Sequence, residues 1–275
     1  MPLSKKYIQS FQQMIFDWWK ANKRDLPWRH TFDPYKIMVS EVMLQQTQVE
    51  RVLTRYIEFI EAYPTVHLLA RAKTSDVLRL WKGMGYNRRA LYLKQTAQAI
   101  LELHNGIFPV SEEALVRLPG IGRYTARAIL VFSFKKDMAM VDTNIRKIIT
   151  NFFFQDQKQP EKVIQEVADK ILPRGKSWEW HQAMMDFGAD SQLKIKDQKS
   201  KIKKKNKSIP FYQSNRFYRG RIMDLLREKK YEHETLLEEL VKTFKKPKSF
   251  FEERIASLVK DGLAVQKEKF IRLPS

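Results

Sequence analysis

The stretch that decides the fold is LPGIGRYTARA, residues 118–128. The residues before it, 111–118, read as a short helix, and a second helix begins near Arg123. Gly120 and Gly122 in the turn tolerate backbone conformations that other residues avoid, and they leave the N–H groups at the start of the second helix uncovered. Such N–H groups, aided by the helix dipole, suit a phosphate oxygen. The stretch predicts a helix-hairpin-helix turn that holds a phosphate backbone, although ordinary close helix pairs also use glycine turns.

The charge balance points to a polyanionic partner. Lys and Arg number 51 against 31 Asp and Glu, which gives a net charge of +20, and such an excess favours binding to nucleic acid. A chain that is 43% hydrophobic and 12% aromatic has the composition of a folded globular protein. It contains no apolar run of about eighteen residues, the minimum for a spanning helix. We therefore expect a cytoplasmic, nucleoid-associated protein with no membrane partner.

Cysteine is absent from the sequence. This excludes disulfides, thiolate zinc sites, iron–sulfur clusters and cysteine nucleophiles. The histidines are scattered without metal-ligand spacing. We expect neither a metal nor a cofactor.

Apolar residues recur at helical spacing before residue 194, and two-residue alternation is scarce, so we expect an all-α fold. One stripe runs from Val39 to Ile60, and further stripes cover 77–80, 90–103, 126–134 and 145–154. Gln46 falls on the first stripe, where an apolar residue is expected. A polar residue on a buried face costs free energy unless it is paired, so Gln46 is a candidate functional residue.

The last third of the chain divides into two parts. Residues 194–209, KIKDQKSKIKKKNKSI, contain eight lysines and no aromatic residue. They read as a linker, a solvated tether or a contact to phosphates. Residues 210–275 predict three short helices and two terminal strands, the order of a winged-helix-like DNA-binding module or of a helical buttress or oligomerisation module. We expect domains at 1–193 and 210–275, joined by 194–209.

Two carboxylates stand near expected helix starts. Asp142 in MVDTNIRK has the position of an N-cap, where the helix dipole lowers the pKa of a carboxyl group. An anion held there could stabilise positive charge at an anomeric carbon during glycosidic cleavage. Glu41 in VSEVMLQQTQV precedes the Gln46 stripe, and a glutamate in a first turn is also ordinary dipole chemistry.

Six segments carry a resemblance to a known family. In chain order they are RDLPWRHTFDPY (24–35), SEVMLQQTQVERV (40–52), GMGYNRRA (83–90), LPGIGRYTA (118–126), MVDTNIRK (140–147) and HQAMMDFGA (181–189). They resemble the sequence blocks of MutY-type adenine DNA glycosylases, members of the helix-hairpin-helix base-excision superfamily. The resemblance implies a DNA glycosylase domain of two helical lobes that receives a base flipped from the duplex.

The resemblance also assigns roles. Glu41 would protonate the flipped purine as general acid, with its pKa raised by burial. Asp142 would stabilise the oxocarbenium-like sugar, or trap it covalently, before water adds. Tyr124 and Asn144 would orient these groups. Lyase-competent relatives carry Lys at the position of Tyr124, so we expect a monofunctional hydrolase that leaves an abasic site. The remaining expected site residues are the DNA contacts Gln46 (the wedge), Arg29, Tyr86, Gly120, Gly122, Arg123 and Thr125, and the base-pocket residues Arg24, Trp28 and Gln182.

The expected reaction is removal of adenine mispaired with 8-oxoguanine or guanine in double-stranded DNA, by a monomer. Three departures from the family stand out. The region after MMDFGA lacks the four cysteines of the usual [4Fe–4S] cluster. The residues from Phe211 are too few for the usual Nudix-like domain. Asn87 stands where a second aromatic residue often follows Tyr86.

Two alternatives stay open at this stage. Thymine/uracil glycosylases acting on G·T or G·U mismatches share several of the quoted segments, whereas the QQT segment resembles the adenine-removing branch. A non-catalytic binder of mismatched or distorted DNA would use the same scaffold without chemistry.

Overall fold

The structure, a computed structural model, describes residues 4–190 and 210–275. The lysine-rich segment that we predicted as a linker, 194–209, lies outside the described residues. Within the described part of the chain, no helix is long and apolar enough to cross a membrane.

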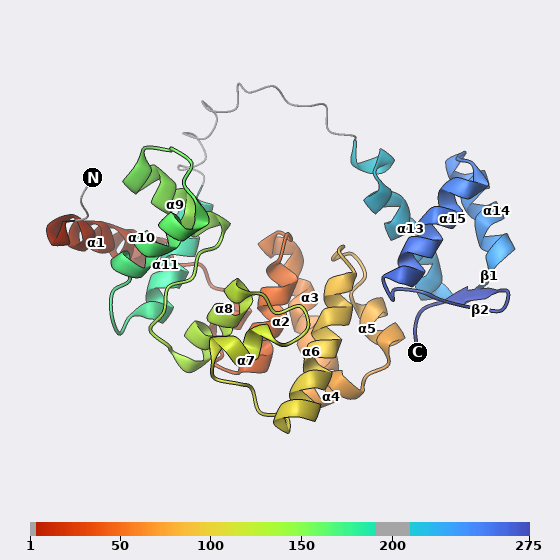
Figure 1. The fold of residues 1–275 in the computed structure, drawn as a ribbon, viewed down its shortest axis with the longest axis horizontal. Coiled ribbons are helices and arrows are strands. Elements are labelled where there is room, and N and C mark those ends of the chain that lie inside the picture. The colour runs from red at the N-terminus through yellow and green to blue at the C-terminus, as the bar shows by residue number, and fades with distance from the viewer. Residues whose placement is uncertain (1–3, 191–209) are drawn as a thin grey trace. The chain divides into compact units, whose positions relative to one another are not determined.

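Helices dominate the described residues, as the periodicity predicts (Figure 1). The α-helices are α1 (Lys5–Asn22), α2 (Pro34–Leu44), α3 (Val49–Ala62), α4 (Val66–Arg71), α5 (Thr74–Leu80), α6 (Arg88–His104), α7 (Glu112–Val116), α8 (Arg123–Phe134), α9 (Thr143–Phe154), α10 (Glu161–Ile171), α11 (Ser177–Ala189), α13 (Asn215–Glu228), α14 (His233–Phe244) and α15 (Lys248–Lys260). Short 3₁₀ turns cover Pro27–Arg29 and Phe211–Gln213, and the strands are β1 (Tyr231–Glu232), β2 (Val265–Lys267) and β3 (Phe270–Arg272).

The chain forms two compact units. Of the described residues, the first unit holds 4–41, 109–117 and 121–190, and the second holds 42–108, 118–120 and 210–275. The expected division into a glycosylase domain over 1–193 and a module over 210–275 follows the chain order, whereas these units follow spatial contacts and interleave. That division therefore stays a prediction.

The core of the first unit forms where α1, α9, α10 and α11 meet. Fully buried members include Ile15, Ile149, Ala183 and Met184. Their spacing on each helix gives one apolar face, which is the pattern that drives helix packing. Because α9 and α11 share this core, the residues at the start of α9 are held in a fixed position.

In the second unit, α4 packs along α6, and α13 contacts both α5 and α15. The strands pair antiparallel in the order β1-β3-β2, with Tyr231 opposite Ile271 and Gln266 opposite Ile271 on its other side. The two predicted terminal strands correspond to β2 and β3. The pattern gave no sign of β1, because a strand of two residues has no periodicity to detect.

The expected helical stripe from Val39 to Ile60 is wrong as a single helix. The chain leaves α2 after Leu44 and enters α3 at Val49, and Gln46 lies exposed in the turn with a left-handed φ of 57°. The guanidinium of Arg89 explains the break, since it donates to the carbonyl oxygens of Val42 (2.9 Å), Met43 (2.8 Å) and Gln45 (2.6 Å). These contacts satisfy carbonyls that a longer helix would otherwise pair.

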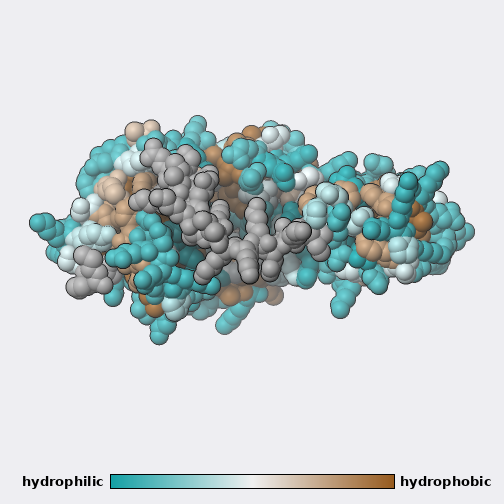
Figure 2. Space-filling model, turned by 90° about the horizontal axis from the view of Figure 1, so that it is seen from above, coloured by the Kyte–Doolittle hydropathy of each residue, from teal (hydrophilic) through white to brown (hydrophobic). Residues whose placement is uncertain are grey.

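The face seen in Figure 2 is mostly hydrophilic, with hydrophobic residues in scattered patches. Large apolar side chains that stand exposed include Leu103, Ile107 and Phe211. Single exposed apolar residues are normal on soluble folds, so each needs a local reason before it indicates a binding site.

Candidate active site

The hairpin forms as the sequence predicts. Ser111 caps α7 by accepting from the N–H of Ala114 at 3.2 Å, and α8 starts at Arg123. Gly120 has a φ of +73°, and a Cβ at this position would lie 2.5 Å from the Cβ of Tyr92, so only glycine fits. Gly122 differs from the expectation: its backbone is extended and its surroundings are open. No side chain caps α8, which leaves its first N–H groups available to an anion.

A cluster of polar side chains forms in the first unit, from three separate segments. Glu41 comes from α2, Tyr124 from the first turn of α8, and Asp142 from the residue before α9; we call these, with Asn144, the carboxyl cluster. The Tyr124 hydroxyl donates a hydrogen bond to the Glu41 carboxyl group. Sequence reasoning thus named four residues that the fold does bring together.

Glu41 is 7% exposed, and no cation faces it in this cluster. Burial, together with the nearby Asp142 carboxylate, raises the pKa of Glu41 to about 7, against the opposing effect of the Tyr124 hydrogen bond. A carboxyl group with this pKa is half protonated near neutral pH, which is the property of an efficient general acid. Burial and the two carboxylates also raise the pKa of Tyr124, so its hydroxyl keeps its proton and acts as a donor.

Asp142 caps α9, as predicted, and its Oδ1 accepts from the N–H of Ile145 at 2.6 Å. The side-chain amide of Asn144 donates to Oδ2 at 3.3 Å. Our expectation for the pKa of Asp142 is wrong in sign. Burial raises this pKa, and the hydrogen bonds from Ile145 and Asn144, which lower it, only offset part of the increase. The helix N-terminus therefore orients this carboxylate but does not set its pKa.

His181 and Gly188, which the sequence analysis did not single out, help to hold Asp142 in place. His181 is buried, and its Nε2 accepts from the N–H of Met140 at 3.1 Å while Nδ1 donates to the carbonyl of Ser177 at 2.6 Å. Burial lowers the pKa of His181 to about 4, so the ring is neutral and can accept that bond. Gly188 lets α9 approach α11, because a Cβ there would lie 2.7 Å from the Cβ of Asn144. Both residues belong to the HQAMMDFGA segment.

A second buried carboxylate, Asp186, lies on α11 and binds two arginines. Arg29 donates to both of its oxygens, at 2.8 and 2.7 Å, and Arg24 donates through Nε at 2.6 Å. The indole N–H of Trp19 adds a bond of 2.9 Å. These partners lower the pKa of Asp186 despite its burial. We call this group the Asp186 clamp; an acid inside the apolar run MMDFG was the sequence signal for it.

The clamp corrects one expected DNA contact. The Arg29 side chain is 4% exposed, and both of its terminal nitrogens bind Asp186, so this arginine holds the N-terminal segment to α11 instead of facing DNA. Arg24 is engaged by the same carboxylate and keeps 36% of its side chain exposed. The other expected pocket residues, Trp28 and Gln182, are both buried in the first unit. Their contact with a base stays a prediction.

The remaining expected DNA contacts divide between the units. Arg123 and Thr125 lie in the first turn of α8, where Arg123 is exposed and pairs with Glu112 at 2.7 Å, while Thr125 is buried. Gln46, Tyr86 and Gly120 belong to the second unit. Gln46 and Tyr86 both have left-handed φ, which is uncommon outside glycine and typical of functional turns.

The residues do not fit an iron–sulfur cluster. Such a cluster needs thiolate ligands, and the sequence contains none, either after α11 or elsewhere. Among the described residues, no three His, Asp or Glu side chains come together as a metal site.

The comparisons with known proteins agree with this geometry. Residues 39–174 match the family described as HhH-GPD superfamily base excision DNA repair protein. The chain is 40% identical over 181 residues to the adenine DNA glycosylase of Mycobacterium tuberculosis, covering 64% of this chain and 59% of that protein. It is 32% identical over 190 residues to the thymine/uracil-DNA glycosylase of Methanothermobacter thermautotrophicus, covering 68% of this chain and 86% of that protein.

A solved structure of a thermostable thymine-DNA glycosylase is also similar. It superposes with a TM-score of 0.63 at 32% identity, covering 67% of this chain and 87% of that one. The fold and the site define a helix-hairpin-helix protein with a buried acid. The chain belongs to the HhH-GPD superfamily of base excision DNA repair proteins. It spans only 52% and 59% of the length of two adenine DNA glycosylases that it matches.

Proposed function

We propose that this protein is a monofunctional DNA glycosylase that removes adenine mispaired with 8-oxoguanine or guanine. The observation that carries the proposal is the carboxyl cluster, in which Glu41 has a pKa of about 7 and lies near Asp142. The likeness to adenine DNA glycosylases, at 40% identity in one case, supports adenine as the base. Superfamily membership supports DNA as the substrate.

The proposed reaction uses each member of the cluster. Glu41 donates its proton to a ring nitrogen of the flipped adenine, and the bond between that base and C1′ breaks with its electron pair passing to the base. Asp142 faces the positive charge that develops on the sugar. A water then forms a bond to C1′ and returns a proton to the Glu41 carboxylate. The products are free adenine and an abasic site.

Tyr124 supports hydrolysis without strand cleavage. A lyase needs a lysine amine that attacks C1′ and forms a Schiff base, whereas the Tyr124 hydroxyl has a raised pKa and is engaged with Glu41. We propose that the DNA strand is released with an abasic site and an uncleaved backbone.

The wider assignments belong to the same proposal. Gln46 would fill the space that the base leaves, and Arg123 with the open N-terminus of α8 would hold the backbone. The enzyme would act as a cytoplasmic, nucleoid-associated monomer without an iron–sulfur cluster. Residues 1–193 would form the glycosylase domain, and 210–275 a winged-helix-like module reached through 194–209.

A second candidate is removal of thymine or uracil opposite guanine. It is favoured by the match to 86% of the length of a thymine/uracil-DNA glycosylase at 32% identity. Glu41 and Tyr124 serve either reaction, so the cluster alone does not choose between them.

Single-turnover base release from a panel of duplexes tests the proposal. The duplexes carry A opposite 8-oxoguanine, A opposite G, T opposite G and U opposite G, and alkali reveals abasic sites. Release from the adenine duplexes alone, lost in Glu41→Gln and kept in the exposed control Glu166→Gln, is the expected result. Release from the T or U duplexes alone would support the second candidate, and no release from any duplex would leave a non-catalytic DNA binder.

A further inference from the structure

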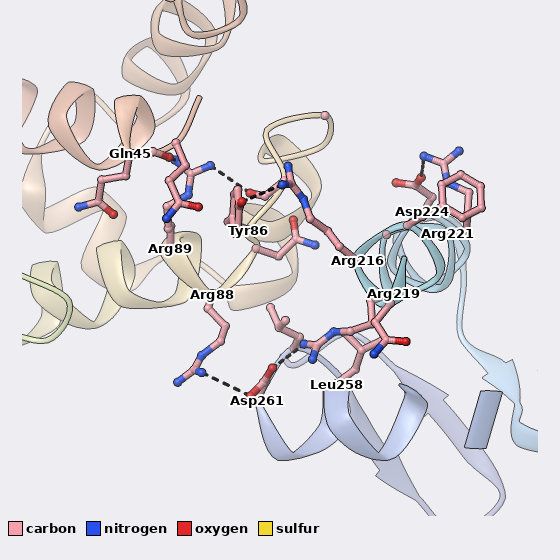
Figure 3. A pocket seen from close by; sticks show the side chains of 18 of the residues that line it. Gln45, Tyr86, Arg88, Arg89, Arg216, Arg219, Arg221, Asp224, Leu258 and Asp261 are labelled. Carbon is pink, nitrogen blue, oxygen red and sulfur yellow. Dashed lines mark hydrogen bonds and ion pairs between the residues drawn. The ribbon is translucent and has the colours of Figure 1, made fainter. Parts of the chain in front are cut away.

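A pocket of about 770 Å³ lies within the second unit, where residues 45–51 and 83–92 meet helix α13 (Figure 3). We call it the arginine pocket, because seven arginines and only two aspartates line it. Its volume is in the range of roughly 300–1,000 Å³ that is usual for ligand sites. Its C-terminal wall lies outside residues 39–174, the part that matches the family.

One wall of the arginine pocket is fixed by buried guanidinium groups. Besides its bonds at the end of α2, Arg89 donates to the carbonyls of Met84 and Gly85, both at 3.1 Å, and so ties the two turns together. Arg227 donates to the carbonyl of Leu78 at 2.9 Å and to the side chain of Asn87 at 3.0 Å. These arginines are occupied, and they make the site rigid before any ligand arrives.

Other residues that line the pocket present exposed aromatic rings beside an arginine. The Arg216 guanidinium lies 4.0 Å from the ring centre of Tyr86 and 5.7 Å from that of Phe211, and donates to the Tyr86 hydroxyl at 2.7 Å. Phe211 is 62% exposed and Tyr86 is 39% exposed. The side chain of Arg51 makes no hydrogen bond or ion pair within residues 4–190 and 210–275. The pocket is thus lined both by exposed stacking surfaces and by Arg51, a positive charge that no described residue pairs.

We propose that the arginine pocket binds one unpaired nucleotide of a DNA strand, with its phosphate on the arginines and its base stacked on Phe211. A phosphate alone would use the charge but not the exposed rings, and a paired base has no free face to stack. Arginine and aromatic side chains together are the combination that binds unstacked nucleotides without strong sequence preference. The excess of five positive charges among the lining residues suits the phosphate.

The pocket also has a relation to the proposed reaction. Gln45 and Gln46 line it, so a nucleotide held there would neighbour the turn that we propose as the wedge. That relation rests on the proposed function, whereas the nucleotide site itself does not.

Fluorescence anisotropy with the full chain tests the site. The probes are a labelled duplex with a single-nucleotide bulge and the same duplex fully paired, neither of which contains a mispaired adenine. We expect the wild type to bind the bulged duplex more tightly. Phe211→Ala should raise the Kd for the bulged duplex about tenfold, the loss of one stacked base, and change the Kd for the paired duplex little.

The chain offers a matched control in the next residue. Tyr212 is 61% exposed and does not line the pocket, so Tyr212→Ala should leave both Kd values unchanged. Arg51→Gln should reduce the salt dependence of binding by about one counterion, because the proposal places a phosphate on the arginines of the pocket. Equal affinity of the wild type for both duplexes, or equal effects of Phe211→Ala and Tyr212→Ala, would overturn the proposal. A failure of the adenine-release assay would not overturn this proposal, because the binding experiment uses duplexes without a mispaired adenine and measures no base release.

Discussion

Two buried carboxylates in the first unit differ in their surroundings. Asp186 is 2% exposed, and the guanidinium groups of Arg29 and Arg24 lower its pKa. Glu41 is 7% exposed, lies near Asp142 and Tyr124 instead of a cation, and has a pKa raised to about 7. Burial acts in the same direction on both groups, so the partners decide the outcome. Asp186, which is paired with arginines, stabilises the fold. Glu41, which has no cation beside it, is left able to exchange a proton.

The largest expected difference between the two acids lies in chemistry. Glu41→Gln removes the proton donor but keeps the shape and the hydrogen bond from Tyr124. We expect single-turnover base release to fall about a thousandfold, within the range of general acid catalysis, with DNA binding retained. If base release persisted at the wild-type rate, Glu41 would not be the acid.

Asp186 should show the reverse behaviour. Asp186→Asn leaves the buried guanidinium group of Arg29, and the partly exposed one of Arg24, without their counter-charge. Breaking a buried pair such as Asp186–Arg29 costs about 3–5 kcal/mol of unfolding free energy. Urea unfolding followed by circular dichroism measures the loss. Asp169→Asn, at an exposed acid on α10, is the control and should change little. An Asp186→Asn variant as stable as the wild type would show that the Asp186 clamp does not stabilise the fold.

The same comparison predicts opposite pH effects on stability. The folded state holds the Glu41 proton up to pH about 7 while the unfolded chain releases it near 4.5, so ionising this buried group destabilises the fold as pH rises between these values. Glu41→Gln should therefore be more stable than the wild type above pH 7, by roughly 3 kcal/mol. The advantage should vanish below pH 4.5. Equal urea midpoints for the two proteins at pH 8 would argue against a raised pKa.

The smallest expected effect concerns Tyr124. Its hydrogen bond lowers the pKa of Glu41, so Tyr124→Phe should raise that pKa further. A hydrogen bond worth about 1 kcal/mol corresponds to less than about one pH unit. The midpoint pH at which the rate of base release falls should therefore rise by less than about one unit in Tyr124→Phe. A shift downward would show that Tyr124 does not donate to Glu41.

Local chemistry in the sequence predicted much of the site. The glycine turn, the cap at Asp142 and the start of α8 depend on neighbouring residues only, and the structure has them where the sequence indicated. The meeting of Glu41, Tyr124 and Asp142 came from the resemblance to a family, because no local rule joins segments so far apart in the chain.

The failures came from distant partners. Arg29 is separated by 157 residues from the carboxylate that binds it, and Arg89 ends α2 from 44 to 47 residues away. A periodicity argument cannot include such contacts, so it ran one helix through Gln46. The resemblance to a family assigned Arg29 to DNA without showing that Asp186 binds it. The expected direction of the pKa shift of Asp142 was wrong for a similar reason, because the burial that raises this pKa depends on the packing of the whole unit.

The central claim is that Glu41 acts as a general acid, because burial without a neighbouring cation raises its pKa and keeps it protonated. The most direct test is the pH profile of single-turnover adenine release from an A opposite G duplex, under saturating enzyme. We predict a rate that falls as pH rises, with a midpoint near 7, because the acid loses its proton there. A rate that stays constant from pH 5.5 to 8.5 would contradict the claim.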